Sequence, residues 1–397
     1  MRIGVDLRSL QTGSQYRGIG YFTYNLQKAV SEIDKENEYI FFANEFGPGE
    51  RYPLLERLVS ETGHRLVALP VTHARDREWG RTWERLSTPF FFRLERMDIL
   101  HVTSLFEDAT PVGFYPFGGK LAVTLYDLIP LIFRADYLDG APEWKSEYMS
   151  LVDLVREHAD GVLAISKCTR DDAVKLIGLP PGKISVVYGA TGDTFSLIED
   201  GARVAELNKR LGVKGDYILF AAAEDFRKNF ENLLKAYAIL RKEYGRTAQL
   251  VMVGKSSPDW RRRLTDLGVS FGLEGGDMVF TGFVTDEEMN LLYNGASVFA
   301  FPSLYEGFGL PVLEAMLCGV PVVVSSNSSL MEVAGDAALL VDPLDPRDMA
   351  EKMNMALADA ALREDLRMRG FLNVKRFSWR KAAEETVNFY RSLSENA

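Results

Sequence analysis

Short apolar runs rich in Val, Ile and Leu alternate along this chain with longer segments of helical periodicity. In the first half these runs predict strands at Arg2–Asp6, Tyr39–Ala43, Leu66–Val71, Ile99–Thr103, Leu121–Tyr126, Val162–Ile165 and Ser185–Tyr188. In the second half they predict strands at Tyr217–Ala222, Gln249–Val253, Met278–Thr281, Val298–Phe301, Val320–Val324 and Leu339–Val341. Continuous apolar strands are covered on both faces, which predicts parallel sheets with helices on each side.

Two helices between and after these strands are predicted most clearly. The first carries apolar residues at the spacing i, i+3, i+4, i+7, namely Phe230, Leu233, Leu234, Tyr237 and Leu240. The second begins after Ser378, a suitable N-cap, and its apolar stripe consists of Ala382, Ala383, Val387, Tyr390 and Leu393.

The chain has 397 residues, which is more than one hydrophobic core usually supports. Two consecutive sets of alternating strands and helices predict the α/β class, with two doubly wound, Rossmann-like domains. The stretch Gly192–Gly215 lacks a strand signal, so we place the junction there and predict domains over residues 1–195 and 196–375.

Composition narrows the function classes. The formal net charge of −10 argues against a nucleic-acid partner, because proteins that bind nucleic acids need a basic surface. The two cysteines are far apart and are predicted to be small apolar core residues of a reduced compartment, and the four histidines show no metal-ligand spacing. The chain opens as a strand without a signal peptide and contains no apolar run of about 20 residues. We therefore expect a cytoplasmic protein.

The segment Tyr305–Glu314 carries the strongest chemical signal. Its two glycines, Gly307 and Gly309, permit close approach of the backbone to a ligand, and a helix N-terminus behind them attracts phosphate. Glu306 on the loop and Glu314 on the following helix can accept hydrogen bonds from hydroxyl groups. Phosphate and hydroxyl recognition together favour a nucleotide sugar.

The other candidate residues also follow predicted strands, where α/β sheets bind ligands. They are the segment Arg8–Gly20, Asp127, Arg227–Asn229 and the pair Gly254–Lys255. With such sites on both domains, we expect the active site in a cleft between them. For single residues a structural interpretation stays open: Asp127 as a turn cap, Lys255 and Arg227 as surface groups, His101 as a core residue.

These motifs resemble the retaining family-4 glycosyltransferases, which have the two-domain GT-B fold. The family signature is a pair of glutamates with seven residues between them, here Glu306 and Glu314, followed by Gly319 and Pro321. Further matches cover nearly the whole chain in family order: Arg17–Gly20, Asp127–Pro130, Val162–Ser166, Arg227–Asn229 and Thr281–Phe283.

The resemblance implies roles for individual residues. Glu306 would hold the hydroxyls of the transferred sugar beside the N–H groups of Gly307, Phe308 and Gly309, and Glu314 would hold the ribose. Lys228, assisted by Arg227, would neutralise the diphosphate leaving group, with Asp127 as a further catalytic residue. Other donor contacts would come from Leu310, Phe283, Gly254, Lys255 and Tyr126, and a phosphate or acceptor loop from Gly18 and Gly20.

The resemblance further implies an enzyme that uses no metal or other cofactor and moves a hexose from a GDP- or UDP-linked donor. The acceptor would be a saccharide or lipid-linked saccharide of bacterial surface polysaccharide assembly, such as lipopolysaccharide, with a mannose- or rhamnose-like sugar. The 1–195 domain would bind the acceptor and the 196–375 domain the donor. The C-terminal helix, within 376–397, would pack back on the N-terminal domain.

Two departures from the family pattern bear on the donor sugar. Tyr126 replaces the usual histidine before Asp127, and a tyrosine with a pKa near ~10 is not an acid at neutral pH. The run Ala221–Ala223 replaces a glycine that usually precedes the Arg-Lys-Asn motif. The departures support one alternative, a non-catalytic nucleotide-sugar-binding subunit. The fold leaves open a second, a glycosyl phosphorylase or a nucleotide-sugar hydrolase or epimerase.

Residues 73–96 combine arginines with aromatic side chains. They fit either a partly buried helix whose arginines pair with neighbouring acids, which we favour slightly, or a peripheral contact with the inner face of an anionic membrane.

Overall fold

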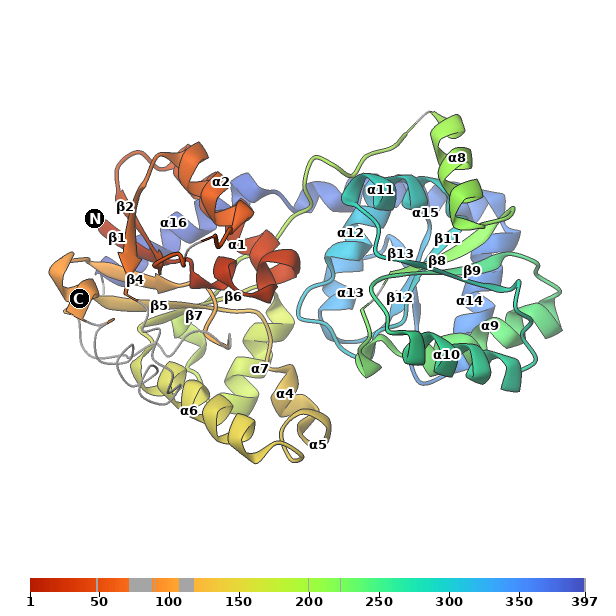
Figure 1. Ribbon diagram of the computed structural model, residues 1–397, viewed down its shortest axis with the longest axis horizontal. Coiled ribbons are helices and arrows are strands. Elements are labelled where there is room, and N and C mark those ends of the chain that lie inside the picture. The colour runs from red at the N-terminus through yellow and green to blue at the C-terminus, as the bar shows by residue number, and fades with distance from the viewer. Residues whose placement is uncertain are drawn as a thin grey trace. The chain divides into compact units, whose positions relative to one another are not determined.

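The computed structural model describes residues 1–47, 49–70, 88, 90–106, 118–198, 200–221 and 223–395. The chain divides into two compact units. Unit 1 comprises Met1–Gly189 together with Ser378–Ala397, and unit 2 comprises Ala190–Phe377. Figure 1 shows that each unit is a sheet with helices on its faces.

In the described part of unit 1, the sheet has seven parallel strands in the order β3-β2-β1-β4-β5-β6-β7. Their bounds are β1 Arg2–Asp6, β2 Glu38–Asn44, β3 Arg65–Leu69, β4 Ile99–Val102, β5 Lys120–Leu125, β6 Gly161–Ala164 and β7 Ile184–Val186. The helices are η1 Arg8–Gln11, η2 Gly13–Tyr16, α1 Gly18–Ile33, α2 Pro53–Thr62, α4 Ile129–Ile132, α5 Arg134–Tyr137, α6 Pro142–His158, α7 Lys167–Ile177, η3 Pro181–Lys183 and α16 Trp379–Glu395.

The described residues of unit 2 form a sheet of six parallel strands in the order β10-β9-β8-β11-β12-β13. Their bounds are β8 Tyr217–Ala221, β9 Gln249–Val253, β10 Met278–Gly282, β11 Val298–Phe301, β12 Val322–Ser325 and β13 Ala338–Val341. The helices are α8 Gly201–Leu211, η4 Phe226–Lys228, α9 Phe230–Tyr244, α10 Pro258–Ser270, α11 Asp286–Gly295, α12 Leu310–Leu317, α13 Ser328–Ala334, α14 Pro346–Ala358, α15 Ala360–Asn373 and η5 Val374–Arg376.

Each sheet has a point at which the strand order reverses. In unit 1 the reversal lies between β1 and β4, and in unit 2 it lies between β8 and β11. The chain leaves neighbouring strands there in opposite directions, and α/β sheets generally bind ligands beyond the carboxyl ends of the strands at such a point. In unit 2 this places the segments after Ala221 and after Phe301 side by side.

The predicted strands are confirmed, with described ends that shift by up to two residues; the predicted ends at Val71 and Ala222 lie outside the described residues. One two-residue correction is at β12, which was predicted to begin at Val320 and begins at Val322. Pro321 intervenes, and a proline has no N–H to give to a sheet ladder. Both clearest helices are confirmed: α9 begins at Phe230, and the Ser378 hydroxyl accepts the Lys381 N–H at 3.2 Å at the start of α16.

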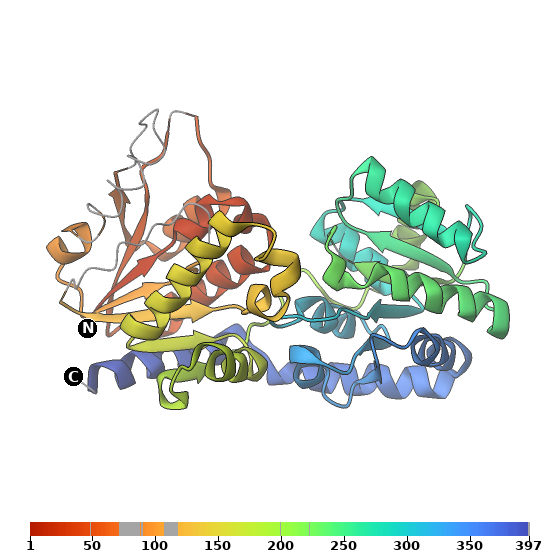
Figure 2. The same cartoon turned by 90° about the horizontal axis from the view of Figure 1, so that it is seen from below.

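Helix α16 belongs to unit 1 although it lies at the opposite end of the sequence. It packs against α1, and Figure 2 shows it in blue beside the sheet, with both chain ends on the same side. Its Tyr390 hydroxyl is 2.7 Å from Nδ1 of His101 on β4, whose Nε2 is 2.7 Å from Thr124 Oγ1. Burial lowers the pKa of His101 to about 4, so the ring is neutral. His101 is thus a core residue.

Two features raised by the sequence lie partly outside the described residues. These are Ala222, in the run that replaces the family glycine, and residues 73–87 with Pro89 of the arginine-rich segment. In the described remainder of that segment, Phe92 is buried and packs edge-on against Phe42, while Phe90 is exposed. Cys318 is buried as predicted, but Cys168, in the first turn of α7, is only partly buried.

Candidate functional site

The loop between β11 and α12, residues 302–309, carries Glu306 in unit 2 and is called the signature loop below. Gly309 has φ 120°, a conformation that other residues rarely adopt, and a Cβ there would lie 2.7 Å from Leu330 Cδ2. Pro311 lies in the first turn of α12, where the missing N–H costs nothing. The loop therefore turns sharply and leads directly into the helix.

Lys228 and Glu306 meet at the point where the strand order reverses. Lys228 Nζ lies 2.6 Å from Glu306 Oε1 and 5.1 Å from the centre of the Phe301 ring. Only 16% of the lysine side chain and 14% of the glutamate side chain are exposed. Such a shielded pair interacts far more strongly than a surface salt bridge. A cation for phosphate and a carboxylate for hydroxyls are thus adjacent.

Asn229 sets the position of Lys228. It is a non-glycine residue with φ 62°, and its side-chain amide donates to the carbonyl oxygens of Pro302 at 3.0 Å and Pro343 at 2.6 Å. Asparagine adopts this left-handed conformation more readily than most residues, and here the two long-range hydrogen bonds hold it in place. Since Pro302 is the first residue of the signature loop, Asn229 ties the Arg-Lys-Asn turn to that loop.

Arg227 is held by an acid that our sequence reading missed. Asp225 accepts hydrogen bonds from Arg227 Nη2 at 2.6 Å and Nε at 3.2 Å, and from the Arg227 N–H at 2.9 Å. Burial opposes the charge on Asp225, but the hydrogen bonds from Arg227 prevail and lower its pKa. The Arg227 carbonyl accepts the Leu304 N–H at 2.7 Å, so this pair also braces the signature loop. Asp225 lies only two residues before Arg227, and this spacing in the sequence could have indicated the pair.

Glu314 lies on α12, eight residues after Glu306, and its hydrogen-bond partner is a neutral hydroxyl group. Its Oε2 accepts a hydrogen bond from the Tyr293 hydroxyl at 3.0 Å. Burial raises the pKa of Glu314 to about 7, against the lowering effect of this hydrogen bond. Tyr293 on α11 was another residue that the sequence did not indicate, because its helical spacing is that of a core aromatic.

A second cluster lies beyond β9 and β10. Lys255 Nζ is 5.3 Å from the centre of the Phe283 ring, and 70% of Phe283 is exposed. Gly254 donates its N–H to the Gly282 carbonyl at 3.0 Å, which joins the two strand ends. An exposed aromatic ring with a cation above it can stack a flat ligand. The predicted donor contact Leu310 lies elsewhere, at the first residue of α12, and is partly buried.

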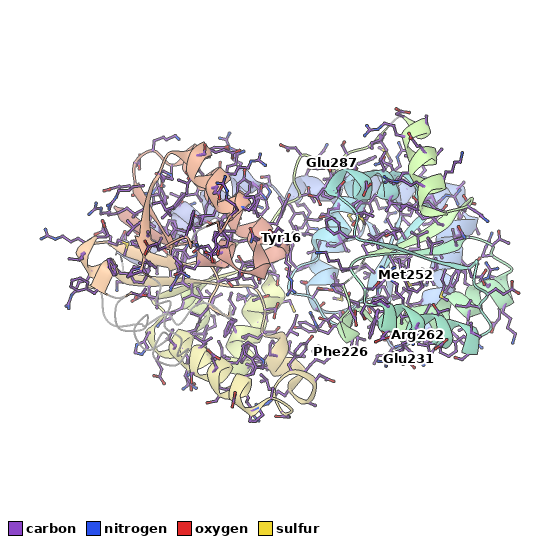
Figure 3. The ribbon with its side chains drawn as sticks, viewed as in Figure 1. Tyr16, Phe226, Glu231, Met252, Arg262 and Glu287 are labelled. Atoms are coloured by element: carbon purple, nitrogen blue, oxygen red, sulfur yellow. The ribbon has the colours of Figure 1, made fainter. Side chains whose placement is uncertain are left out.

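Figure 3 labels residues from the core and from the surface of unit 2. Met252 on β9 is buried within the unit, whereas Phe226 at the start of η4, Glu231 on α9 and Arg262 on α10 lie at its periphery. Phe226 is 39% exposed directly before the Arg-Lys pair.

Two candidates of unit 1 follow β5. The Tyr126 hydroxyl is 2.9 Å from Thr23 Oγ1 on α1, and its ring packs edge-on against Phe22. Asp127 Oδ1 accepts the Ile129 N–H at 3.0 Å, so this carboxylate caps the turn that leads into α4. Tyr126 is thus engaged in packing, and Asp127 has at least the structural role of a cap.

The two glycines of the first loop differ in their surroundings. A Cβ at Gly20 would lie 2.5 Å from Gln15 Cα and 2.6 Å from the Ser14 carbonyl oxygen, whereas a Cβ at Gly18 would contact nothing within 4 Å. Gly20 is therefore required for the packing of α1 on η2. Tyr16, at the end of η2, is 77% exposed (Figure 3).

Unit 2 thus collects Glu306, Lys228 and Arg227 around one loop, with Glu314 on the adjoining helix, whereas Tyr126, Asp127, Gly18 and Gly20 belong to unit 1. In the part of the chain that the structure describes, no group of three or more His, Cys, Asp or Glu side chains is arranged to hold a metal ion. No helix formed by the described residues is long and apolar enough to cross a membrane.

Comparison with known families matches both halves of the chain. Residues 16–191 match the family described as "Glycosyltransferase Family 4", and residues 206–372 match "Glycosyl transferases group 1". The O-antigen chain mannosyltransferase B of Escherichia coli is 32% identical over 285 residues, which cover 71% of this chain and 73% of that protein. The chain belongs to glycosyltransferase family 4.

A second relative is longer than this chain. The serotype-specific mannosyltransferase WbdA of Escherichia coli is 29% identical over 412 residues, which cover 100% of this chain and 49% of WbdA. The family-4 chain therefore spans about half the length of this relative.

Solved structures show that the fold is GT-B. HepE of Anabaena, solved in complex with UDP and glucose, has a TM-score of 0.75 at 16% identity, covering 99% of this chain and 100% of HepE. WaaG, a glycosyltransferase involved in lipopolysaccharide biosynthesis, has a TM-score of 0.69 at 14% identity, covering 97% of this chain and 98% of WaaG. The predicted family and fold class are thus confirmed.

Proposed function

We propose that this chain is a retaining glycosyltransferase that moves a hexose from a nucleoside diphosphate sugar to a saccharide or lipid-linked saccharide. The observation that carries the proposal is the pair formed by Lys228 and Glu306 beyond β8 and β11. It joins a cation suited to a diphosphate with a carboxylate suited to sugar hydroxyls. Mannose is the favoured sugar, because the relatives named above are mannosyltransferases.

The chemistry follows from where charge develops during transfer. Departure of the nucleoside diphosphate leaves negative charge on phosphate oxygens and positive charge on the sugar ring. Lys228 stabilises the first and Glu306 the second, and preorganised charges of this kind are usually a large part of catalysis. The donor diphosphate replaces Glu306 as the partner of Lys228, which releases the carboxylate toward the sugar. The reaction needs no covalent bond to the enzyme, since the acceptor attacks from the face that the phosphate leaves.

The remaining donor contacts follow the same surface of unit 2. Glu314 binds the ribose hydroxyls, and the exposed ring of Phe283 with Lys255 stacks the base. The donor is GDP- or UDP-linked and binds without a metal cofactor. The acceptor contacts unit 1 around Gly18 and Asp127.

The first test is thermal unfolding of the full chain with GDP, UDP, ADP or dTDP. A ligand at a hundredfold excess over its dissociation constant stabilises the protein by about 2.7 kcal/mol. One diphosphate is expected to stabilise the wild type, and this stabilisation is expected to be lost in Lys228→Ala. The matched control is Lys235→Ala, which removes an exposed lysine on α9 that pairs with Glu231.

Turnover with the corresponding nucleotide sugar completes the test. Glu306→Ala is expected to abolish transfer while nucleoside diphosphate binding is partly kept, and the anomeric configuration of the product, measured by NMR, is expected to equal that of the donor. Stabilisation by none of the four diphosphates, or an inverted product, would contradict the proposal.

A further inference from the structure

The residues at the start of α13 pack against the signature loop. Four consecutive residues, Asn327 to Leu330, contact it: the Asn327 amide donates to the Leu304 carbonyl at 2.8 Å, and Leu330 packs against Gly309. Asn327 is the N-cap residue of α13, yet its side chain makes no capping hydrogen bond to its own helix. The polar side chains here serve the neighbouring loop.

Ser329 is the central contact. Its side chain is fully buried, and its hydroxyl donates to the carbonyl oxygens of Glu306 at 2.8 Å and Phe308 at 2.7 Å. A serine hydroxyl has one proton, so the two carbonyls share it. One side chain thereby fixes two alternate peptide groups of the signature loop.

The planarity of the peptide bond extends this effect to the other side of the loop. In a trans peptide the C=O of one residue and the N–H of the next point in opposite directions. With the carbonyls of Glu306 and Phe308 directed at Ser329, the N–H groups of Gly307 and Gly309 are directed away from α13. Backbone N–H groups directed to one side of a turn can bind an anion.

Ser328 makes a further hydrogen bond to the signature loop, in addition to the two made by Ser329. Its hydroxyl oxygen accepts the Glu306 N–H at 3.2 Å. Its φ is 50°, in the left-handed region, which costs a non-glycine residue about 1–2 kcal/mol. A strained backbone that is kept beside a site commonly serves to aim a group. Here it aims the Ser328 hydroxyl at the backbone of Glu306.

We infer that Ser328 and Ser329 are positioning residues: they set the direction of the Gly307 and Gly309 N–H groups toward the donor's phosphates and of Glu306 toward the sugar. This inference rests on the proposed function for the identity of the ligand. Neither serine touches the reacting atoms, so both act through the loop.

The test compares Ser329→Ala with Ser325→Ala. Ser325 is also fully buried, at the end of β12, but its hydroxyl has no hydrogen-bond partner among the described residues, so the control removes a buried hydroxyl of the same size. Affinities for the nucleoside monophosphate and diphosphate, with the base taken from the GDP, UDP, ADP and dTDP screen, are measured by calorimetry on the full chain. Ser329→Ala is expected to reduce the preference for diphosphate and kcat by about tenfold each, and Ser325→Ala to change neither.

Ser328→Gly is the second variant and guards against misfolding of the first. Glycine adopts φ 50° without strain, so the unfolding temperature is expected to stay level or rise while kcat falls about fivefold. Loss of activity without loss of stability is a result that a purely structural role does not give. The inference is overturned if both serine variants fold and keep the wild-type kcat and diphosphate preference.

Failure of the proposed function gives a different pattern. If the wild type binds nucleotides but transfers no sugar, the proposed function falls, and the diphosphate preference of the serine variants still decides the inference. If the wild type binds no nucleotide, both are overturned.

Discussion

At the scale of single residues, the two signature glutamates differ in how their charge is balanced. Glu306 is paired with the Lys228 ammonium, while Glu314 accepts a hydrogen bond from the neutral hydroxyl of Tyr293. Burial raises the pKa of Glu314 to about 7. The ligand-free protein therefore holds Glu314 near its midpoint at neutral pH, and binding of hydroxyl donors favours its charged form.

This difference predicts how stability depends on pH. Because the folded-state pKa of Glu314 is raised, the folded protein binds the proton more tightly than the unfolded chain, and the protein loses stability as pH rises from about 4.5 to about 7. Glu314→Gln is expected to be more stable than the wild type at pH 8, on the order of 2 kcal/mol, and nearly equal at pH 4.5. Urea unfolding at both pH values measures this.

The control for this prediction is Glu206→Gln, which neutralises an exposed glutamate on α8. It is expected to leave the pH dependence unchanged. An equal effect of Glu314→Gln at pH 4.5 and pH 8 would refute the role of the raised pKa. Nucleoside diphosphate affinity of the wild type is expected to fall below pH 7, since protonated Glu314 accepts fewer hydrogen bonds from the ribose.

At the scale of elements, the packing of α1 on η2 depends on one of two neighbouring glycines. Gly20 lies against the backbone of Gln15, while the Cβ position of Gly18 is open space in the first turn of α1. A sequence motif that contains both glycines does not distinguish them. Their different surroundings separate a packing role from a role in ligand approach.

Alanine substitutions at the two glycines are expected to have opposite effects. Gly20→Ala forces the backbone of α1 or η2 to shift and is expected to lower the free energy of unfolding by about 1–3 kcal/mol. Gly18→Ala is expected to raise it by up to about 1 kcal/mol, since alanine favours the helix. Denaturant unfolding of both variants measures the difference. Equal stabilities of the two variants would show that the close contact at Gly20 does not determine the stability of this packing.

At the scale of the whole molecule, the chain builds unit 1 from two separate segments. Residues 1–189 form its sheet, and α16 returns after unit 2 to complete it. The Tyr390 hydroxyl of α16 supplies the partner of the buried Nδ1 of His101. Without α16, this nitrogen and the apolar surface beneath the helix would lose their cover.

Unit 2 is therefore expected to fold when residues 190–377 are expressed alone, since this segment is continuous and contains its own core. Residues 1–189 alone are expected to be unstable, because they lack α16. Thermal unfolding by circular dichroism measures both fragments, and addition of a synthetic peptide of residues 378–397 is expected to restore the second. A cooperative transition of 1–189 without the peptide would contradict this account.

The sequence alone determined the elements, the order of the family motifs and the expected phosphate and hydroxyl chemistry. Buried parallel strands leave continuous apolar runs, and glycines with acids at fixed spacing are local signals, so both can be read along the chain. Only the tertiary structure decided which side chains meet. The pair Lys228 and Glu306 is separated by 78 positions, and Ser329 reaches back 21 positions to Phe308. Such contacts follow from strand order and from how helices pack, which a local pattern does not encode.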